Sequence, residues 1–389
     1  MKTILVTGSA GFIGANLVLR LLEDSGIPRH SGLDHSRHSG LDPESLRIVG
    51  LDNLNDYYDP SLKEYRLRLI EAKAGEHPEH DYVFFKGDIA NKELVDKLFA
   101  QYPFDIVVNL AAQAGVRYSI ENPDAYIQSN MMGFYNILEA CRHSKDVIPG
   151  LTRNLNYKGV EHLIYASSSS VYGGNKKIPF SVDDRVDNPV SLYAATKKSN
   201  ELFAHCYSKL YNIPTTGLRF FTVYGPAGRP DMAYFGFTNK LLRGETIQIF
   251  NYGNCRRDFT YVDDIIEGIV RVMWKAPDTR HSGLDPASQT PDQVRGDDVP
   301  YAIYNIGGGQ PENLLDFVRI LQEELVAAGV LPPDYDFEAH KQLVPMQPGD
   351  VPTTYADASA LERDFGFTPR ITLREGLRKF AQWYKEYYG

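Results

Sequence analysis

The 389-residue sequence is poor in cysteine and has no long apolar run. Its three cysteines, Cys141, Cys206 and Cys255, form neither a Cys-x-x-Cys pair nor an even set, which argues against a disulfide framework and favours a reducing compartment. No stretch reaches the ~18 consecutive apolar residues of a membrane-spanning helix, and glycines interrupt the apolar N-terminal run, unlike in a secretory signal peptide. We therefore expect a cytoplasmic protein without a membrane partner.

An excess of positive charge is also absent. The 41 lysines and arginines are outnumbered by 50 acidic residues, which gives a formal net charge of -9. Because a protein that binds nucleic acid carries a basic footprint, this balance argues against a nucleic-acid partner. The 10 histidines lack the spacing of metal ligands, and we predict no metal site.

The sequence contains instead an alternation of short apolar runs and amphipathic stretches. The runs predict strands at Thr3–Thr7, Arg47–Leu51, Tyr82–Lys86, Ile106–Leu110, His162–Ala166 and Thr215–Phe220. The amphipathic stretches predict helices at Gly14–Leu22, Lys92–Ala100, Gly133–Cys141, Leu192–Tyr211, Asp263–Trp274, Leu314–Leu325 and Leu373–Tyr384. This order predicts an α/β fold, a Rossmann-type doubly wound parallel sheet with a smaller, interleaved C-terminal substrate-binding lobe. We assign residues 1–224 and 258–309 to the sheet domain and residues 225–257 and 310–389 to the lobe.

A glycine-rich turn follows the first predicted strand in "VTGSAGFIG". Glycines allow the backbone to turn tightly and approach a pyrophosphate, and the N-terminus of the following helix supplies N–H donors. The strand–turn–helix context is the one that this mechanism requires. We therefore predict a dinucleotide-binding loop at Gly8, Gly11, Phe12, Ile13 and Gly14.

An acidic residue about 20 positions further on, after the second strand, is expected to hold the adenosine ribose. Asp52 in "RIVGLDN" ends the second predicted strand, but it follows Gly14 at almost twice that spacing. Its carboxylate would repel a 2′-phosphate, which favours NAD over NADP. Beside it we include Asn53, and after the third strand Asp88, which can accept from the adenine amino group, with its neighbour Ile89.

Short polar strings explain the spacing of Asp52. "RHSGLD" begins at residue 29, "RHSGLDPES" occupies residues 37–45, and "RHSGLDPAS" occupies residues 280–288. The strings have no fixed period, so they do not form a solenoid repeat. We interpret residues 25–46, 146–157 and 277–299 as insertions into peripheral loops, with no part in the chemistry.

The sequence "SLYAATKKSNEL" places Tyr193 and Lys197 four residues apart in a predicted helix. Residues at this spacing are neighbours on one helix face. A phenol has a pKa near 10 and is a poor base at neutral pH, and we expect the Lys197 ammonium, together with a positive nicotinamide ring, to favour the phenolate. The pair can then take a proton from a sugar hydroxyl. The serine run Ser167–Ser170, at the carboxyl end of the fifth strand, offers a hydroxyl for the same group.

These motifs, in this order, resemble the extended short-chain dehydrogenase/reductase family that acts on nucleotide sugars. The resemblance extends over nearly the whole chain apart from the insertions, and it implies NAD as cofactor, a UDP-sugar substrate and a homodimer. In that family the catalytic hydroxyl lies three residues before the valine of "VYG", which is Ser168 here. The resemblance therefore implies Ser168, Tyr193 and Lys197 as catalytic residues, with the last two also contacting the cofactor.

Further segments resemble the cofactor and substrate segments of the family. "NLAAQAGVRYS" and "SNMMGFYN" imply that Leu110, Ala111, Ala112 and Asn130 lie near NAD. "RRDFTYVDD" implies that Arg257 binds the diphosphate of the sugar nucleotide, and "QPGDVP" implies that Asp350 binds its ribose.

The segment "FFTVYGPAGRPDMA" resembles the equivalent stretch of UDP-glucuronate 4-epimerases, which implies that Thr222 and Arg229 hold a sugar carboxylate. Dehydratases and decarboxylases of the family usually carry acids where this chain has Ser169 and Ser170, and Ser169 is taken as substrate-binding. The resemblance thus implies NAD-dependent epimerisation of UDP-glucuronate to UDP-galacturonate through a 4-keto intermediate, in polysaccharide biosynthesis. A 4-epimerase of a neutral UDP-hexose, a nucleotide-sugar decarboxylase or dehydratase, and a non-catalytic dinucleotide-binding protein remain as alternatives.

Overall fold

A computed structural model describes residues 1–23, 45–144, 159–278, 299–347 and 350–389. The insertion predicted at residues 146–157 lies outside the described residues, as do all but the ends of those predicted at 25–46 and 277–299. One boundary was wrong: Leu46, placed in the first insertion, is the first residue of a strand. It pairs with Lys2 and is buried, because the apolar side chain packs into the core.

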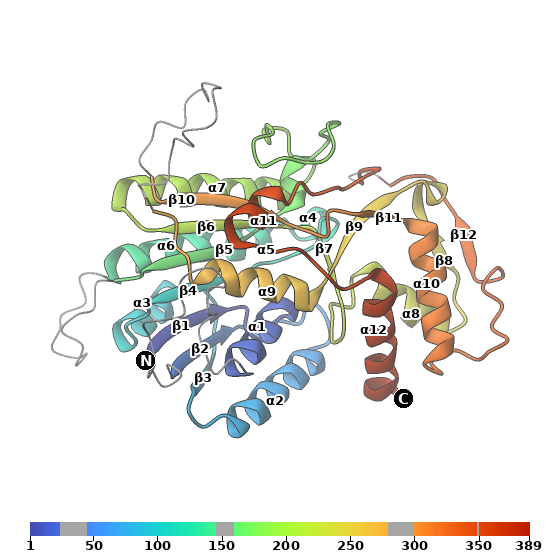
Figure 1. Cartoon of the computed structure of the whole chain (residues 1–389), viewed down its shortest axis with the longest axis horizontal. Helices are drawn as coiled ribbons and strands as arrows, with labels where there is room; N and C mark the ends of the chain where they lie inside the picture. Colours follow the sequence, from blue (N-terminus) through green and yellow to red (C-terminus); the bar gives the residue numbers. More distant parts are fainter. Residues whose placement is uncertain (24–44, 145–158, 279–298, 348–349) are drawn as a thin grey trace, which may run out of the picture.

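Seven parallel strands form the central sheet (Figure 1). In spatial order they are β10 (Tyr301–Ile306), β6 (Thr215–Phe220), β5 (His162–Ser168), β4 (Ile106–Asn109), β1 (Lys2–Thr7), β2 (Leu46–Asp52) and β3 (Asp81–Lys86). The strand order reverses beside β1, which pairs with both β2 and β4. In such sheets ligands bind at the carboxyl ends of the strands that flank the reversal. The predicted doubly wound sheet is confirmed.

Helices cover both faces of the sheet. Side chains of β1 alternate between two hydrophobic cores, because successive residues of a strand point to opposite faces: Ile4 and Val6 lie in one core and Leu5 in the other. The first core includes α1 (Phe12–Glu23), α2 (Ser61–Glu76) and α9 (Val262–Met273), and the second includes α3 (Lys92–Gln101), α6 (Gly133–His143) and α7 (Leu192–Tyr211). Ser191 caps α7 by accepting from the amide of Ala194.

Helix α2 was not anticipated from the sequence. Its apolar residues do not form a clear stripe, because two of the positions that it buries are occupied by the cations Lys63 and Arg66. Buried charges of this kind break the apolar periodicity by which an amphipathic helix is recognised. Both cations lie close to the site described below.

A smaller group of elements lies beside the main sheet, on the right in Figure 1. It contains the strands β7 (Thr222–Tyr224), β9 (Arg256–Tyr261) and β11 (Pro311–Asn313) of a three-stranded sheet, β8 (Ile247–Ile249) and β12 (Lys341–Leu343) of a two-stranded sheet, and the helices α8 (Ala233–Leu242), α10 (Leu314–Ala327) and α12 (Leu373–Tyr388). The aromatic C-terminal helix α12 buries Phe380, Trp383 and Tyr384. The predicted division into a sheet domain and a lobe stays a prediction.

Short elements complete the fold: α4 (Tyr118–Glu121), α5 (Pro123–Tyr126), the π-helix η1 (Ile127–Met132), the 3₁₀ turns η3 (Ser169–Tyr172) and η4 (Phe250–Gly253), and α11 (Ser359–Phe365). Within the described ranges, no helix combines the length and apolarity needed to cross a membrane. The same residues include no group of three or more His, Cys, Asp or Glu placed to hold a metal ion.

His162 is a fully buried titratable group at the start of β5. Its Nδ1 lies 3.1 Å from the carbonyl of Met273 in α9, and its Nε2 lies 2.8 Å from the hydroxyl of Thr216 in β6. A carbonyl can only accept, so Nδ1 donates and Nε2 accepts, as in a neutral ring. Burial lowers the pKa of His162 to about 4.

We predict that His162 makes the stability of the protein depend on pH. The unfolded chain binds a proton near pH 6.5 and the folded chain does not, so this contribution is complete above pH 6.5 and is lost as the pH falls towards 4. It amounts to about 3 kcal/mol over that range. Urea unfolding between pH 7 and 5 should show a shallower loss of stability in His162→Gln than in wild type. The exposed His205→Gln is the control, and an unchanged pH dependence in His162→Gln would contradict the account.

The glycine loop between β1 and α1 packs without space for a side chain. A Cβ at Gly14 would lie 2.1 Å from the carbonyl oxygen of Gly8, a main-chain atom that cannot rotate away. Gly75, in α2, has nothing within 4 Å of such a Cβ.

Gly14→Ala is therefore expected to destabilise the protein by about 1–3 kcal/mol through overpacking. Gly75→Ala, in the last turn of α2, is the matched control and should leave the stability almost unchanged, because nothing obstructs its Cβ. Denaturant unfolding of both variants measures the difference. If Gly14→Ala were as stable as Gly75→Ala, the glycine loop would have space for a Cβ, and the account of its packing would be wrong.

Candidate active site

The described residues enclose a cavity of about 890 Å³ at the carboxyl ends of β1, β4 and β5. It extends from the glycine loop to the smaller group of elements. Of the residues predicted for the site, those that line it are Gly8, Gly11, Phe12, Ile13, Gly14, Asp52, Asn53, Asp88, Ile89, Leu110, Ala111, Ala112, Ser168, Ser169, Tyr193, Lys197, Thr222, Arg229, Arg257 and Asp350. The fold thus brings together residues that are up to 342 positions apart in the sequence.

Asn130 was predicted near the cofactor but does not line the cavity. It is buried, and its side chain binds the main chain of Gln113 twice, accepting from the amide at 2.8 Å and donating to the carbonyl at 3.0 Å. Asn130 therefore holds the segment after β4 from behind. Its side chain also donates to the hydroxyl of Thr196 at 3.1 Å, which connects the segment to α7 next to Lys197.

The glycine loop has the form of a pyrophosphate cradle. Gly8 has a φ of +69°, in the left-handed region that favours glycine. A Cβ there would lie 2.8 Å from the amide nitrogen of Ala111, so the loop and the segment after β4 approach each other through main chain alone. Because side chains are excluded, the loop backbone and the N-terminus of α1 face the cavity, which fits the phosphates of a dinucleotide.

Asp52 lies against this loop despite its long sequence spacing. Its carboxylate accepts from the amides of Ala10 at 3.2 Å and Leu54 at 2.8 Å, and Lys63 Nζ lies 3.6 Å away. Burial lowers the pKa of Lys63, opposed by the charge of Asp52. An acid at this place fits the ribose of a dinucleotide.

Asp88 and Asn53 lie next to each other at the same end of the cavity. The carboxylate of Asp88 accepts from the side-chain amide of Asn53 at 2.9 Å and from the main-chain amide of Ala90 at 2.8 Å. These bonds fix the carboxylate where the cavity would receive an adenine.

The three predicted catalytic residues come from two elements. Ser168 is the last residue of β5, and Tyr193 and Lys197 lie in the first turns of α7. Lys197 Nζ donates to the carbonyl of Ala166 at 2.8 Å and lies 6.0 Å from the centre of the Tyr193 ring. The three side chains line one part of the cavity.

Burial shifts the pKa values of both titratable side chains in this cluster. Burial raises the pKa of Tyr193; the hydroxyl of Ser168 and the charge of Arg229 oppose this shift, and Lys197 is not among its causes. Burial and Arg229 lower the pKa of Lys197 to about 8. The expectation that the Lys197 ammonium and a bound nicotinamide ring favour the phenolate of Tyr193 stays a prediction.

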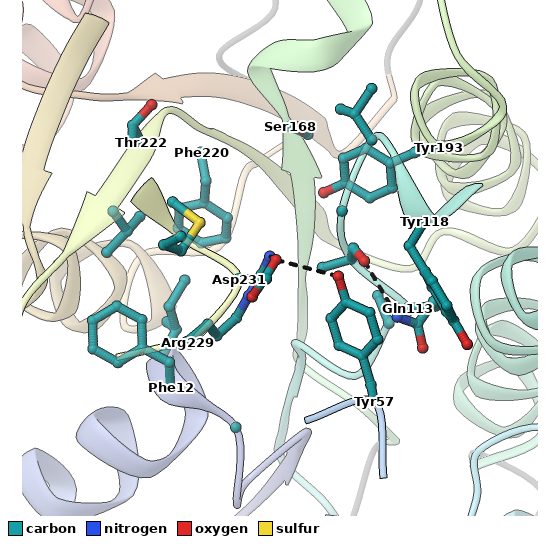
Figure 2. A pocket seen from close by; sticks show the side chains of 18 of the residues that line it. Phe12, Tyr57, Gln113, Tyr118, Ser168, Tyr193, Phe220, Thr222, Arg229 and Asp231 are labelled. Carbon is teal, nitrogen blue, oxygen red and sulfur yellow. Dashed lines mark hydrogen bonds and ion pairs between the residues drawn. The ribbon is translucent and has the colours of Figure 1, made fainter. Parts of the chain in front are cut away.

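Arg229 forms a paired network with two residues that the sequence did not single out. Its Nε and Nη2 donate to the two carboxylate oxygens of Asp231 at 3.0 and 2.6 Å. The hydroxyl of Tyr57 donates to Asp231 at 3.3 Å, as Figure 2 shows. Asp231 lies within the quoted segment "GRPDMA", whereas Tyr57 lies in a loop with no recognisable motif.

Thr222 and Arg229 were predicted to hold one carboxylate together. Both line the cavity. Figure 2 shows Thr222 apart from the Arg229 side chain, with Phe220 between them in the view. The guanidinium of Arg229 instead faces the end of the cavity that contains Tyr57 and Tyr118.

Arg257, in β9, and Asp350, in the C-terminal segment, both line the cavity. Arg257 Nη1 donates to the carbonyls of Arg256 and Pro352, both at 3.0 Å. Asp350 pairs with Arg117 at 3.4 Å, and the Arg117 guanidinium lies 5.1 Å from the centre of the Phe250 ring. Cations and an aromatic ring thus gather beside the C-terminal segment.

Comparisons with known proteins identify relatives along the whole chain. Residues 4–283 match the model of the NAD dependent epimerase/dehydratase family. Protein CapI of Staphylococcus aureus is 46% identical over 387 residues, which cover 99% of both chains. UDP-glucuronate 4-epimerase 4 of Arabidopsis thaliana is 43% identical over 390 residues, which cover 99% of this chain and 76% of that protein.

A solved structure with the same architecture is UDP-glucuronic acid 4-epimerase from Bacillus cereus, in complex with UDP-glucuronic acid and NAD. It is 29% identical, has a TM-score of 0.74 and covers 99% of each chain. Together with the family model, these similarities confirm the family and the NAD dependence that the motifs implied. The chain belongs to the NAD-dependent epimerase/dehydratase family.

Proposed function

We propose that the protein is a UDP-sugar 4-epimerase that converts UDP-glucuronate to UDP-galacturonate through a 4-keto intermediate. The observation that carries the proposal is Arg229, a cation that lines the same cavity as Ser168, Tyr193 and Lys197. Relatives named UDP-glucuronate 4-epimerases, similar over 99% of this chain, support the same substrate.

Some residues of the cavity would bind the cofactor, and others would bind the sugar. The glycine loop would hold the pyrophosphate of NAD, with Asp52 on its ribose and Asp88 at the adenine. Bound there, NAD would accept a hydride from C4 of the sugar and return it, and its positive nicotinamide ring would favour the phenolate of Tyr193. Tyr193 takes the proton of the 4-hydroxyl and later gives it back, and Ser168 binds the same oxygen.

Arg229 and Lys197 have different roles in the proposed reaction. The charge of Arg229 lowers the pKa of Tyr193 and so favours the phenolate that the reaction needs. Lys197 holds its ammonium on the Ala166 carbonyl at the end of β5, next to Ser168. From there we propose that it binds the cofactor, as the family resemblance implies.

Arg229 has a specific task in the chemistry of a glucuronate. Oxidation at C4 places a ketone β to the carboxylate, and such a group loses CO₂ when the breaking C–C bond aligns with the carbonyl π system. Because Asp231 binds Nε and Nη2, the Nη1 edge of the guanidinium is left for a second carboxylate. A guanidinium fixed in this way would hold the substrate carboxylate out of alignment.

The serines after Ser168 support epimerisation over the alternatives. Ser169 and Ser170 line the cavity at positions where dehydratases and decarboxylases of the resembled family carry acids. Neither serine supplies an additional acid or base. Epimerisation of a neutral UDP-hexose would leave the Arg229 edge without a carboxylate partner.

We also propose that the protein is a cytoplasmic homodimer that supplies an activated uronic acid for polysaccharide biosynthesis. The support for the dimer is a set of exposed apolar side chains on two adjacent helices, α6 and α7. Tyr135 on α6 is 38% exposed, and Leu202 and Leu210 on α7 are 58% and 64% exposed. Exposed apolar side chains on two neighbouring helices are compatible with a contact between proteins.

Arg229→Ala is predicted to reduce kcat/KM for UDP-glucuronate by about 100-fold, because a charge-assisted bidentate contact is lost. Its affinity for UDP-glucose, measured by titration, should change less than threefold, and a UDP-pentose should appear as a side product. Arg243→Ala, at an exposed arginine outside the cavity, is the control. If Arg229→Ala weakened the binding of UDP-glucose as much as that of UDP-glucuronate, Arg229 would not be the residue that binds the sugar carboxylate.

Charged substitutions on α7 test the proposed dimer. Leu202→Glu combined with Leu210→Glu should convert the dimer to a monomer in sedimentation experiments, because two carboxylates would be buried in the contact. Leu315→Glu, at an exposed leucine on α10, should leave the assembly unchanged. A wild-type protein that sediments as a monomer at all concentrations would exclude the dimer.

A further inference from the structure

Arg66 of α2 is a buried arginine with a complete set of hydrogen bonds. Its side chain is almost fully buried, at 1% exposure of the residue. Nε and Nη2 both donate to the carbonyl of Ala227, at 2.9 and 2.7 Å, and Nη2 also donates to the carbonyl of Gly228 at 3.1 Å. Nη1 donates to the carbonyl of Ala10 and to the hydroxyl of Tyr58, at 2.9 and 2.8 Å. All five N–H donors of the guanidinium are used.

These partners belong to two separate parts of the active site. Ala10 lies in the glycine loop, and Ala227 and Gly228 immediately precede Arg229. Ala227 has a φ of +50°, in the left-handed region that an alanine rarely adopts. Two hydrogen bonds from Arg66 to its carbonyl stabilise this strained turn. One guanidinium therefore connects the loop proposed for NAD with the turn that presents Arg229.

The charge of Arg66 has no carboxylate partner among these five bonds. By contrast, the buried Arg219 donates from Nε and Nη2 to the two oxygens of Glu201, at 2.8 and 2.9 Å. A buried cation that binds only neutral oxygens destabilises the folded state, because its loss of hydration is not offset by a negative charge. An apolar residue at this place would avoid that cost but would leave three carbonyls without a donor. Arg66 thus fixes the positions of the two segments although the burial of its charge lowers the stability of the fold.

Arg66 does not line the cavity, so it acts on ligands through the backbone that it holds and through Tyr58, whose side chain it binds and which does line the cavity. We propose that Arg66 is a positioning residue that fixes the glycine loop and the Arg229 turn relative to each other. Retention of NAD and binding of the sugar carboxylate then both depend on Arg66. The part that concerns the carboxylate rests on the proposed function, and the part that concerns NAD does not.

The experiment compares Arg66→Met and Arg66→Lys with Arg68→Met and Arg68→Lys, at an exposed arginine of the same helix. Each variant is purified as the full chain, the NAD retained after gel filtration is quantified, and KM and kcat are measured with UDP-glucuronate. Arg66→Met should retain less than half of the wild-type NAD. Its KM, measured with NAD added to saturation, should rise about tenfold, the equivalent of one or two lost hydrogen bonds. Its kcat should change less than its KM, because Ser168 and Tyr193 lie on other elements and are connected to the turn only through the charge of Arg229.

A second arm separates positioning from a general loss of stability. If Arg66 acts on the sugar through Arg229, then Arg66→Met should raise KM less than twofold in the Arg229→Ala background. A full tenfold rise in that background, or NAD content and KM like those of the Arg68 variants, would overturn the proposal. If Arg66→Met does not fold, the KM and the NAD content of Arg66→Lys test the proposal instead. A lysine keeps the charge but cannot span both segments, so KM should still rise several-fold.

Failure of the proposed function is distinguishable from failure of this inference. A wild-type protein that retains NAD but does not convert UDP-glucuronate would refute the epimerase activity. NAD retention in the Arg66 variants would still test the connection to the glycine loop. Normal conversion by wild type with unchanged NAD retention and KM in Arg66→Met would refute the inference and leave the proposed function intact.

Discussion

Main-chain packing at the end of β1 leaves no room for side chains, and the rest of the site is placed relative to it. The amide of Gly8 donates to the carbonyl of Leu51 at 2.7 Å, which fixes the end of β2 beside the glycine loop. A Cβ on Gly8 would lie 2.8 Å from the amide nitrogen of Ala111, so the segment after β4 is equally close. Because these three strands meet at the reversal of strand order, one backbone arrangement positions the loop, Asp52 and the segment after β4.

Burial then determines the electrostatics of the cavity. It raises the pKa of Tyr193 and lowers that of Lys197 to about 8, so both groups are displaced towards their neutral forms. The charge of Arg229 lowers both pKa values, while Asp231 raises that of Tyr193. The guanidinium that we propose for the sugar carboxylate therefore also influences the proton transfer. In this proposal a single ion pair would connect the selection of the substrate with acid–base chemistry.

The sequence predicted the parts of the fold and site that have a local signature. The glycine loop, the spacing of Tyr193 and Lys197, and the alternation of strands and helices each arise from contacts within a few residues. Helix α2 escaped prediction because it buries Arg66 where an apolar residue is expected. Asp231 and Tyr57 are 174 positions apart in the sequence and come into contact only in the folded chain. No local sequence pattern could therefore predict their contact. The effect of burial on the pKa of Tyr193 could not be predicted from the sequence, because burial is a property of the folded chain.

The central claim is reversible oxidation at C4 of UDP-glucuronate, and product analysis by NMR in D₂O tests it most directly. The hydride removed from C4 returns to the same carbon, and the proton handled by Tyr193 moves only between oxygen atoms. The account predicts UDP-galacturonate with protium at both C4 and C5. A UDP-pentose as the main product, deuterium at either carbon, or no conversion at all would contradict it.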